Sequence, residues 1–189
     1  MKICRSCGLP APRSTFTCAY CSSPFPSPAP AVYRVTPGAA CYRWLRHDSV
    51  VVLEAHDCDG IWHLCLPGST QPVLTLLGVA VATGTAPALV DPDGSLVASL
   101  TIPETGTPTV AVVRDRDDSV VTVARGDGPG AIHLVDARGE VTALASRAGN
   151  GRRVGLDVLV TRPTGDEALL FGILLGLELL RLGHLRVAS

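Results

Sequence analysis

Four cysteines near the start of the chain have the residue type and spacing that could bind a metal ion. Cys4 and Cys7 form one Cys-x2-Cys pair, Cys18 and Cys21 form a second, and ten residues separate the two pairs. Four thiolates complete the closed tetrahedral shell of a structural Zn²⁺ site. Iron and a redox-active dithiol are the alternatives for the same cysteines. We predict one structural Zn²⁺ ion bound by these four residues.

The segment around these cysteines resembles the short zinc ribbons at the N-termini of many prokaryotic proteins. Gly8 suits the tight turn after the first pair, whereas Ser22 stands where the commonest form has glycine. The resemblance covers residues 1–23 and implies a small module that the metal stabilises and that contacts proteins. A nucleic-acid role is disfavoured, because few side chains could serve it: Lys2, Arg5, Arg13, Phe16 and Tyr20.

A second group of metal-ligating side chains is predicted on one hairpin, which turns at Asp59-Gly60. A two-residue turn pairs Cys58 with Ile61, and then His56 with His63 and Glu54 with Cys65. Because strand side chains alternate between faces, the inner face carries Leu53, Ala55, Trp62 and Leu64, and the outer face carries His56, Cys58, His63 and Cys65. We interpret the outer set as ordinary surface residues, with a second metal site as the alternative, and Cys41 as a plain buried thiol.

Sequence patterns of known catalytic sites are missing. The chain has no G-x-S-x-G, H-E-x-x-H or P-loop motif. Asp115, Asp117 and Asp118 could suggest a cation-binding loop, but the interleaved Arg114 and Arg116 would repel the cation, so a solvated hairpin turn is favoured. We therefore predict that the protein is not an enzyme. A small hydrolase or nucleotide-binding enzyme is the less favoured alternative.

Length and composition are those of one domain with a small appendage. The chain has 189 residues, a formal net charge of -1 and only 4% aromatic residues, so the core should consist mainly of Val, Leu and Ala. This charge gives no sign of a nucleic-acid-binding protein. The opening MKICRSCG lacks the apolar stretch of a signal peptide, which predicts a cytoplasmic protein, with peripheral membrane association left open.

A proline-rich spacer and a long series of short strands follow the cysteines. Residues 22–30 carry proline at alternate positions and should be extended. From Ala31 onward, strand patterns separated by Asp-Gly and similar turns recur about every ten residues, which indicates a sandwich or barrel. The clearest strands are Val32–Val35, Cys41–Leu45, Val50–Ala55, Ile61–Leu66, Val73–Leu77 and Val79–Thr83, with shorter ones near Leu89, Leu96, Val110, Val120, Ile132, Val141 and Val154.

One helix is predicted from Thr164 to Gly183. Thr164 and Glu167 have the spacing of a capping box, and Gly183 is a stop signal. Ten consecutive residues, 168–177, are apolar or glycine, so this helix has no polar face and must be surrounded. Membrane insertion is the less favoured environment, because the apolar run is short of the roughly 20 residues that a bilayer requires.

We predict that the strands close into a barrel around this helix. A barrel of about twelve strands is wider than its own side chains can fill, and a helix can occupy the remaining interior. Gly172 and Gly176 would allow a close approach to the barrel wall, and Glu178 and Arg181 could pair near its mouth. The predicted fold class is mainly β, a closed antiparallel barrel around a hydrophobic C-terminal helix, with a small N-terminal zinc ribbon.

The run of short strands with D-x-x-G turns, followed by an all-apolar C-terminal helix, resembles the tubby C-terminal-like superfamily. This superfamily includes phospholipid scramblases and LURP-one-related proteins. The best segments are residues 89–100, 134–145 and the helix. The resemblance implies a twelve-stranded barrel around a central helix and a role in binding phosphoinositides, membranes or lipids. No functional residue can be transferred, since no lysine follows Lys2 and the palmitoylation and calcium-binding patterns of scramblases are not evident.

Three domains and a binding role follow from these patterns. We assign residues 1–23 to the zinc ribbon, 24–38 to the linker and 39–189 to the barrel. The predicted function is that of a non-catalytic binding or scaffold protein. Its partner is expected to be a protein or an anionic lipid surface, for which Arg147, Arg152 and Arg153 are the first candidates. A tail-anchored zinc-ribbon membrane protein is the alternative.

Overall fold

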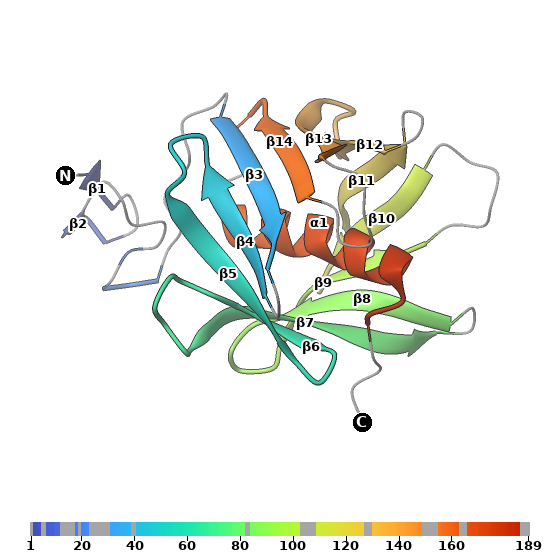
Figure 1. Cartoon of the computed structure of the whole chain (residues 1–189), viewed down its shortest axis with the longest axis horizontal. Coiled ribbons are helices and arrows are strands. Elements are labelled where there is room, and N and C mark those ends of the chain that lie inside the picture. Colours follow the sequence, from blue (N-terminus) through green and yellow to red (C-terminus); the bar gives the residue numbers. More distant parts are fainter. Residues whose placement is uncertain are drawn as a thin grey trace.

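Twelve antiparallel strands close into a barrel around a single helix (Figure 1). The computed structural model describes residues 2–4, 7–11, 18, 20–22, 31–38, 41–81, 84–102, 109–126, 130–148, 155–162 and 166–185. The barrel strands are β3 (Ala31–Pro37), β4 (Cys41–Arg46), β5 (Val51–Cys58), β6 (Ile61–Cys65), β7 (Pro72–Val81), β8 (Gly84–Val90), β9 (Leu96–Thr101), β10 (Thr109–Asp115), β11 (Val120–Gly126), β12 (Ala131–Asp136), β13 (Val141–Ala148) and β14 (Gly155–Val160). Each strand pairs with its neighbours in the chain, so the barrel is an up-and-down meander.

The first and last strands of the meander close the barrel. In β14, Leu156 pairs with Val35 of β3 and Val158 pairs with Tyr33. Every strand therefore has two neighbours, and no sheet edge remains open for pairing with another chain. The predicted fold class, a closed antiparallel barrel around a C-terminal helix, is confirmed.

Two predicted boundaries are wrong. Strand β3 begins at Ala31 and pairs with both β14 and β4, so residues 31–37 belong to the barrel and not to a linker over 24–38. Val73–Leu77 and Val79–Thr83 are not separate strands, because β7 runs unbroken from Pro72 to Val81 and its Gly78 pairs with Pro87 of β8.

Helix α1 (Glu167–Leu182) begins later than the capping-box pattern predicts. Its N-cap is Asp166, whose Oδ1 accepts a hydrogen bond from the Leu169 backbone N–H at 2.9 Å, and Thr164 lies outside the described residues. Glu167 is not the partner in a capping box, because its Oε1 accepts a hydrogen bond from the Tyr33 hydroxyl at 2.7 Å. The predicted C-terminal stop is confirmed, since Gly183 has the left-handed conformation with a φ of 68°.

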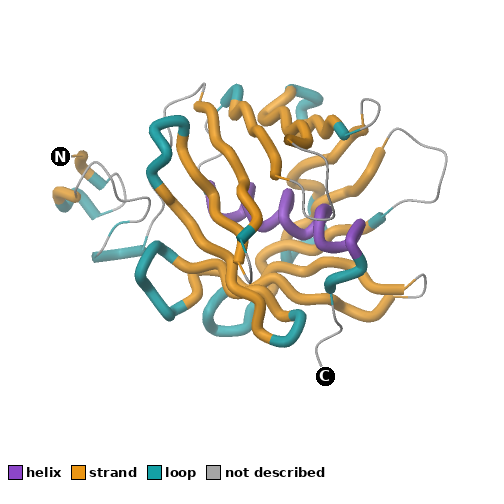
Figure 2. The backbone as a smooth tube through the Cα atoms, in the orientation of Figure 1, coloured by secondary structure: helices purple, strands orange, loops and turns teal. Residues whose placement is uncertain are grey.

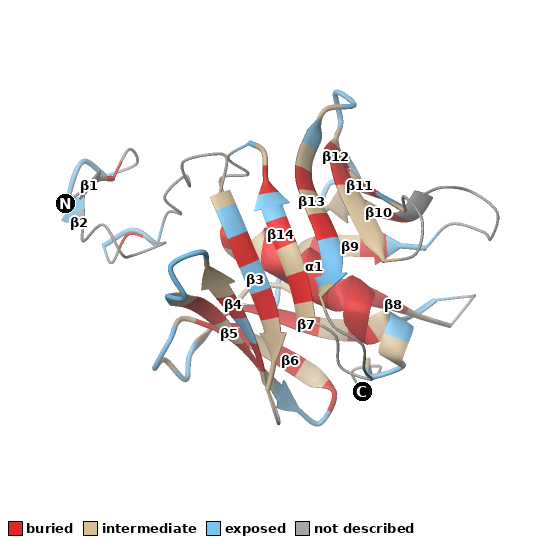
Figure 3. Cartoon of the chain, turned by 45° about the horizontal axis from the view of Figure 1, so that its top comes forward, coloured by how far each residue is buried: buried red, intermediate tan, exposed pale blue. Residues whose placement is uncertain are grey.

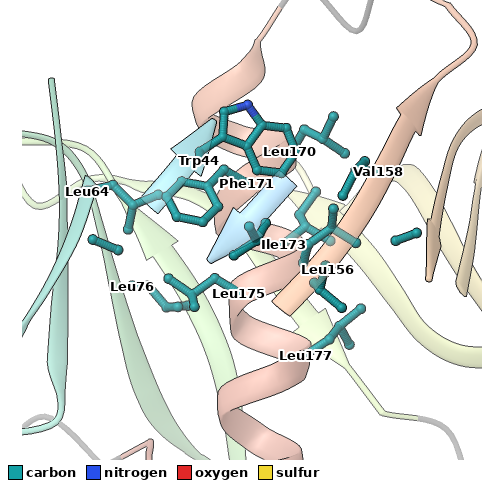
Figure 4. Packing of buried hydrophobic residues seen from close by; sticks show 14 of the residues in the cluster. Trp44, Leu64, Leu76, Leu156, Val158, Leu170, Phe171, Ile173, Leu175 and Leu177 are labelled. Atoms are coloured by element: carbon teal, nitrogen blue, oxygen red, sulfur yellow. The ribbon is translucent and has the colours of Figure 1, made fainter. Parts of the chain in front are cut away.

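The barrel interior is filled by this helix. Eleven of its sixteen residues are buried, and the helix is enclosed by strands on all sides (Figures 2 and 3). The ring of Phe171 lies 5.3 Å from that of Trp44, which in turn stacks on Tyr33 at 4.9 Å (Figure 4). The core therefore forms between the helix and the inner faces of the strands.

Two glycines let the helix approach the wall, as predicted. A Cβ atom on Gly172 would lie 2.6 Å from Leu89 Cδ2, and one on Gly176 would lie 3.2 Å from Pro87 Cβ. At 2.6 Å a Cβ atom on Gly172 would clash, so Leu89 would have to move. At 3.2 Å a Cβ atom on Gly176 would displace Pro87 only slightly. Leu89 is completely buried, so its side chain has little space into which to move.

Gly172→Ala is expected to destabilise the barrel, and Gly176→Ala is its matched control. Alanine gains about 1 kcal/mol over glycine in helix propensity, but overpacking a dense core costs about 1–3 kcal/mol. We expect a net loss of up to about 2 kcal/mol for Gly172→Ala and a nearly neutral effect for Gly176→Ala. Chemical denaturation measures both. Equal stabilities for the two variants would contradict the close approach at Leu89.

The predicted ion pair between Glu178 and Arg181 is confirmed. Glu178 is 4% exposed, and its Oε1 lies 2.5 Å from Arg181 Nη2. Arg147 also contributes, with its Nε 3.5 Å from Glu178 Oε2. Two partly exposed guanidinium groups thus compensate one buried carboxylate near the C-terminal end of α1, where the helix dipole also favours positive charge.

Three hairpins share the same aspartate-capped turn. Asp91 directly follows β8, and Asp115 and Asp136 end β10 and β12. Each Oδ1 accepts two backbone N–H groups, from the residues two and four positions later. Residues 89–100 and 134–145, the best segments of the family resemblance, therefore share this turn. Asp115, Asp117 and Asp118 form a hairpin turn, as favoured over a cation loop, with Asp118 at a φ of 60°.

Asp136 is expected to make the stability of the folded barrel depend on pH. Hydrogen bonds from the backbone N–H groups of Glu140 and Arg138 hold the pKa of the Asp136 carboxyl group below its ordinary value. Its contribution is therefore present above the unfolded pKa of about 3.9 and is lost as the pH falls through the folded pKa. Asp136→Asn keeps an acceptor but not the charge, so its unfolding midpoint should lie below that of the wild type at pH 7 and approach it near pH 2. If the difference in unfolding midpoint between wild type and Asp136→Asn does not change with pH, or if the control Asp93→Asn shows the same trend, the charge of Asp136 is not the cause.

Across the described part of the chain, no helix has both the length and the apolarity needed to cross a bilayer. Helix α1 has sixteen residues and lies inside the barrel.

Candidate metal centre

The four N-terminal cysteines come together in space, as their spacing predicts. All four sulfur atoms lie within 4.8 Å of one another. Cys4 Sγ is 3.6 Å from Cys21 Sγ, and Cys7 Sγ is 3.5 Å from Cys18 Sγ, so none of the four forms a disulfide. Sulfurs at 2.3 Å from a tetrahedral ion would be roughly 3.8 Å apart. The four thiols therefore fit a single metal ion.

Two similar turns present these thiols. The Gly8 N–H donates to the Cys4 carbonyl at 2.8 Å, and the Ser22 N–H donates to the Cys18 carbonyl at 2.8 Å. Gly8 has a φ of 72° and Ser22 a φ of 54°, so the serine adopts the conformation that favours glycine. A short pairing of β1 (Lys2–Ile3) with β2 (Pro10–Ala11) joins the ends of the first turn. Ser22 stands where zinc ribbons commonly have glycine, and the turn nevertheless keeps the same geometry.

The site has a buried and an exposed side. Cys4 and Cys18 are 2% and 1% exposed, whereas Cys7 and Cys21 are exposed. The Leu9 backbone lowers the pKa of Cys7, but desolvation and the crowded thiols of Cys18, Cys21 and Cys4 together raise that pKa to about 12. Because the pKa of Cys7 is raised, binding of a metal ion to its thiolate must release a proton and must weaken as the pH falls.

The metal-binding segment and the barrel together line a cavity of about 440 Å³. Cys18 and Ser22 form one side, and the other side comes from the barrel end where α1 begins, including Gln71, Pro92 and Asp166. A second, mainly apolar pocket of about 250 Å³ lies at the same end, between β11–β13 and the first turns of α1. Neither cavity was predicted from the sequence, because its lining comes from segments far apart in the chain.

The hairpin register predicted around Asp59-Gly60 is confirmed. Cys58 pairs with Ile61, His56 with His63 and Glu54 with Cys65, and the inner-face residues Leu53, Ala55, Trp62 and Leu64 are buried. Two outer-face expectations are wrong. Cys65 is only 2% exposed, and Cys41 is not buried but lies on the outer face opposite His56.

Several predicted functional residues remain untested. Arg147 pairs with Glu178, whereas Arg152 and Arg153 lie outside the described residues, so the arginine cluster suggested for lipid binding is not assembled by the described part of the chain. Of the residues considered for nucleic-acid contact, Arg5, Arg13 and Phe16 also lie outside it. Among the described residues, the four thiols form the one group of three or more metal-ligating side chains whose ligand atoms lie close together.

Comparison with known proteins supports the fold. No family model matches the chain, and no curated protein matches it. The chain is similar in structure to a protein from Arabidopsis thaliana solved by X-ray crystallography, with a TM-score of 0.60 and 13% sequence identity, over 83% of this chain and 94% of the plant protein. At this identity the likeness concerns the barrel fold alone.

Proposed function

We propose that the protein is a non-catalytic binding protein in which a structural zinc module is tethered to a tubby-like barrel that recognises a partner protein. The four clustered thiols support the zinc module, since closed four-thiolate shells are typical of structural Zn²⁺ sites. The filled barrel supports a surface role, because α1 occupies the space that an internal ligand would need. The layout of twelve strands around an apolar helix supports the tubby-like assignment.

The proposal for partner binding is based on the β7–β8 hairpin. From Pro72 to Val90 the chain has no charged residue. Val79 is 42% exposed and Val81 is 44% exposed, and Ala80 between them is exposed as well. Val79 and Val81 are two residues apart on β7, so their side chains lie on the same face of the hairpin, whereas Ala80 points to the other face. We call Val79 and Val81 the hairpin patch.

A patch of this kind is what a partner protein would bury. Exposed apolar side chains that gather on one protruding element often mark interaction sites. The hairpin extends past the C-terminal end of α1, away from the end of the barrel that lies near the metal-binding segment (Figure 1). The two parts of the chain could therefore hold different partners at the same time, as a scaffold requires.

Site-specific crosslinking tests this proposal. A photoreactive amino acid at position 79 is expected to crosslink to one discrete protein in cells, whereas the same group at Val32, which is 50% exposed on another part of the barrel, should not. Val81→Asp should abolish the crosslink without unfolding the barrel. An anionic lipid is the second candidate. Flotation of the purified protein with phosphatidylserine vesicles, lost in Val81→Asp, together with no crosslink at position 79, would replace the protein partner by a membrane surface.

A further inference from the structure

A second set of metal-ligating side chains gathers on the outer face of strands β4–β6. Two of the three cysteines outside the N-terminal module, Cys41 and Cys58, are accessible on this face, with two of the five histidines of the chain. Cys41 of β4 pairs with His56 of β5, and His56 pairs with His63 of β6. Cys58 lies two residues beyond His56 on the same strand and therefore on the same face. We call Cys41, His56, Cys58 and His63 the outer donor cluster.

The spacing of this cluster suits one ion above His56. Residues directly opposite on antiparallel strands have Cβ atoms about 4.5–5.5 Å apart, and alternate residues of one strand lie about 6.8 Å apart. His56 thus has one donor on each side, Cys41 and His63, and a third along its own strand, Cys58. The imidazole groups of His56 and His63 and the thiol of Cys58 are partly or fully exposed, so a metal ion can reach them from solvent.

His63 is already oriented as a ligand would be. Its Nδ1 lies 3.1 Å from Thr75 Oγ1, and Thr75 is only 9% exposed. In the tautomer whose Nδ1–H donates to this hydroxyl, Nε2 carries the free lone pair and points away from the bond. Histidines that bind metals are commonly held in this way by a partner on the other ring nitrogen. Thr75 thus acts as a positioning residue for His63.

Glu54 places a negative charge beside the cluster. Its Oε2 lies 3.7 Å from His56 Nε2, while its Oε1 accepts a hydrogen bond from Arg43 Nε at 3.0 Å. A carboxylate at this distance favours a cation near the imidazole. Cys65 does not belong to the cluster, because its side chain is only 2% exposed and a metal ion in solvent cannot reach its thiol.

We infer that the outer donor cluster binds a second transition-metal ion of borderline softness, such as Zn²⁺, through His56, His63, Cys41 and Cys58. Two nitrogens and two thiolates are a common tetrahedral set for zinc, and thiolates exclude Mg²⁺ and Ca²⁺. In the metal-free conformation these donors are not gathered as those of the N-terminal module are. The sulfur of Cys41 lies against Gly38, and binding requires it to rotate about χ1 toward His56.

Cobalt titration of the full chain tests this site separately from the first one. The variant C4S/C7S/C18S/C21S removes the N-terminal thiols and leaves the outer donor cluster intact. It should bind one equivalent of Co²⁺, with the visible absorption of a tetrahedral site and a thiolate-to-cobalt charge-transfer band, and Zn²⁺ should displace the cobalt. Adding C41S/C58S should remove the charge-transfer band, and adding H56Q/H63Q should remove the binding.

Two further variants distinguish a preorganised metal site from surface side chains that bind metal nonspecifically. Thr75→Val keeps the shape of the side chain but not the hydroxyl, and it should weaken Zn²⁺ binding by about 10–100-fold. His47→Gln changes an exposed histidine in the β4–β5 turn and should have no effect. A folded C4S/C7S/C18S/C21S variant that binds no Co²⁺, or one whose binding survives H56Q/H63Q, would overturn the inference.

Discussion

Removal of helix α1 is expected to abolish folding of the barrel. A truncation after Thr161 should aggregate or remain unfolded, whereas the full-length chain should be soluble without detergent. The helix supplies Leu170, Phe171, Ile173, Leu174, Leu175, Leu177 and Leu179 to the core, each 7% exposed or less. Burial of one such side chain is worth about 1.5–3 kcal/mol, so losing all seven costs about 10–21 kcal/mol, as much as the roughly 5–15 kcal/mol that stabilises a typical domain or more.

A point variant measures the same packing in a chain that still folds. Phe171→Ala should cost about 3–5 kcal/mol, because Phe171 is completely buried against Trp44. Leu182→Ala, at the partly exposed end of the helix, is the matched control and should cost much less. Chemical denaturation followed by tryptophan fluorescence compares the two. A folded, soluble truncation, together with a full-length chain that requires detergent, would show that the helix does not form the core.

Loss of the metal is expected to unfold the N-terminal module and leave the barrel intact. Structural Zn²⁺ contributes apparent binding energies of about 10–16 kcal/mol to isolated zinc fingers, and the regular structure of the module's described residues is limited to the two-residue strands β1 and β2. C4S/C7S should therefore lose one equivalent of tightly bound zinc. It should also lose hydrogen-exchange protection at residues 2–11, with unchanged protection in β3–β14.

Ser22→Gly is the matched control for this experiment. It keeps all four thiols and relieves the positive φ of Ser22, so zinc content and protection should be equal to those of the wild type or greater. Metal analysis and exchange mass spectrometry provide both measurements. If C4S/C7S keeps its full zinc content, the thiols are not the ligands. If the barrel unfolds as well, the module and the barrel are one cooperative unit.

Local patterns in the sequence were sufficient for most of the fold. Alternation of apolar residues and Asp-Gly turns located the strands, because a two-residue turn fixes the register of His56 with His63. The unbroken apolar run identified the helix as an enclosed element, and Gly172 and Gly176 marked its closest approach to the wall. The Cys-x2-Cys spacing identified the metal-binding thiols, since all four ligands come from one short segment.

Features that depend on contacts between distant segments could not be predicted in this way. Tyr33 and Glu167 are far apart in the chain, and their hydrogen bond replaces the capping box that the local pattern suggested. Cys41 lies on the outer face because β4 pairs with β5, and the sequence between these two strands contains no tight-turn motif that would predict their register. Val32–Val35 is predicted as a strand but falls within the predicted linker 24–38, and only the pairing of β3 with β14 assigns it to the barrel.

The pairing of β3 with β14 has a consequence for synthesis of the protein in the cell. Roughly 145 residues separate the end of β3 from the end of α1. At about 5–20 residues per second, the ribosome needs on the order of 7–29 s to make them. During that time the apolar inner faces of the strands have no helix to cover them, and β3 lacks its last neighbour. Such long-range closure is slow, so the apolar faces of the nascent barrel stay exposed to non-native contacts until translation reaches α1.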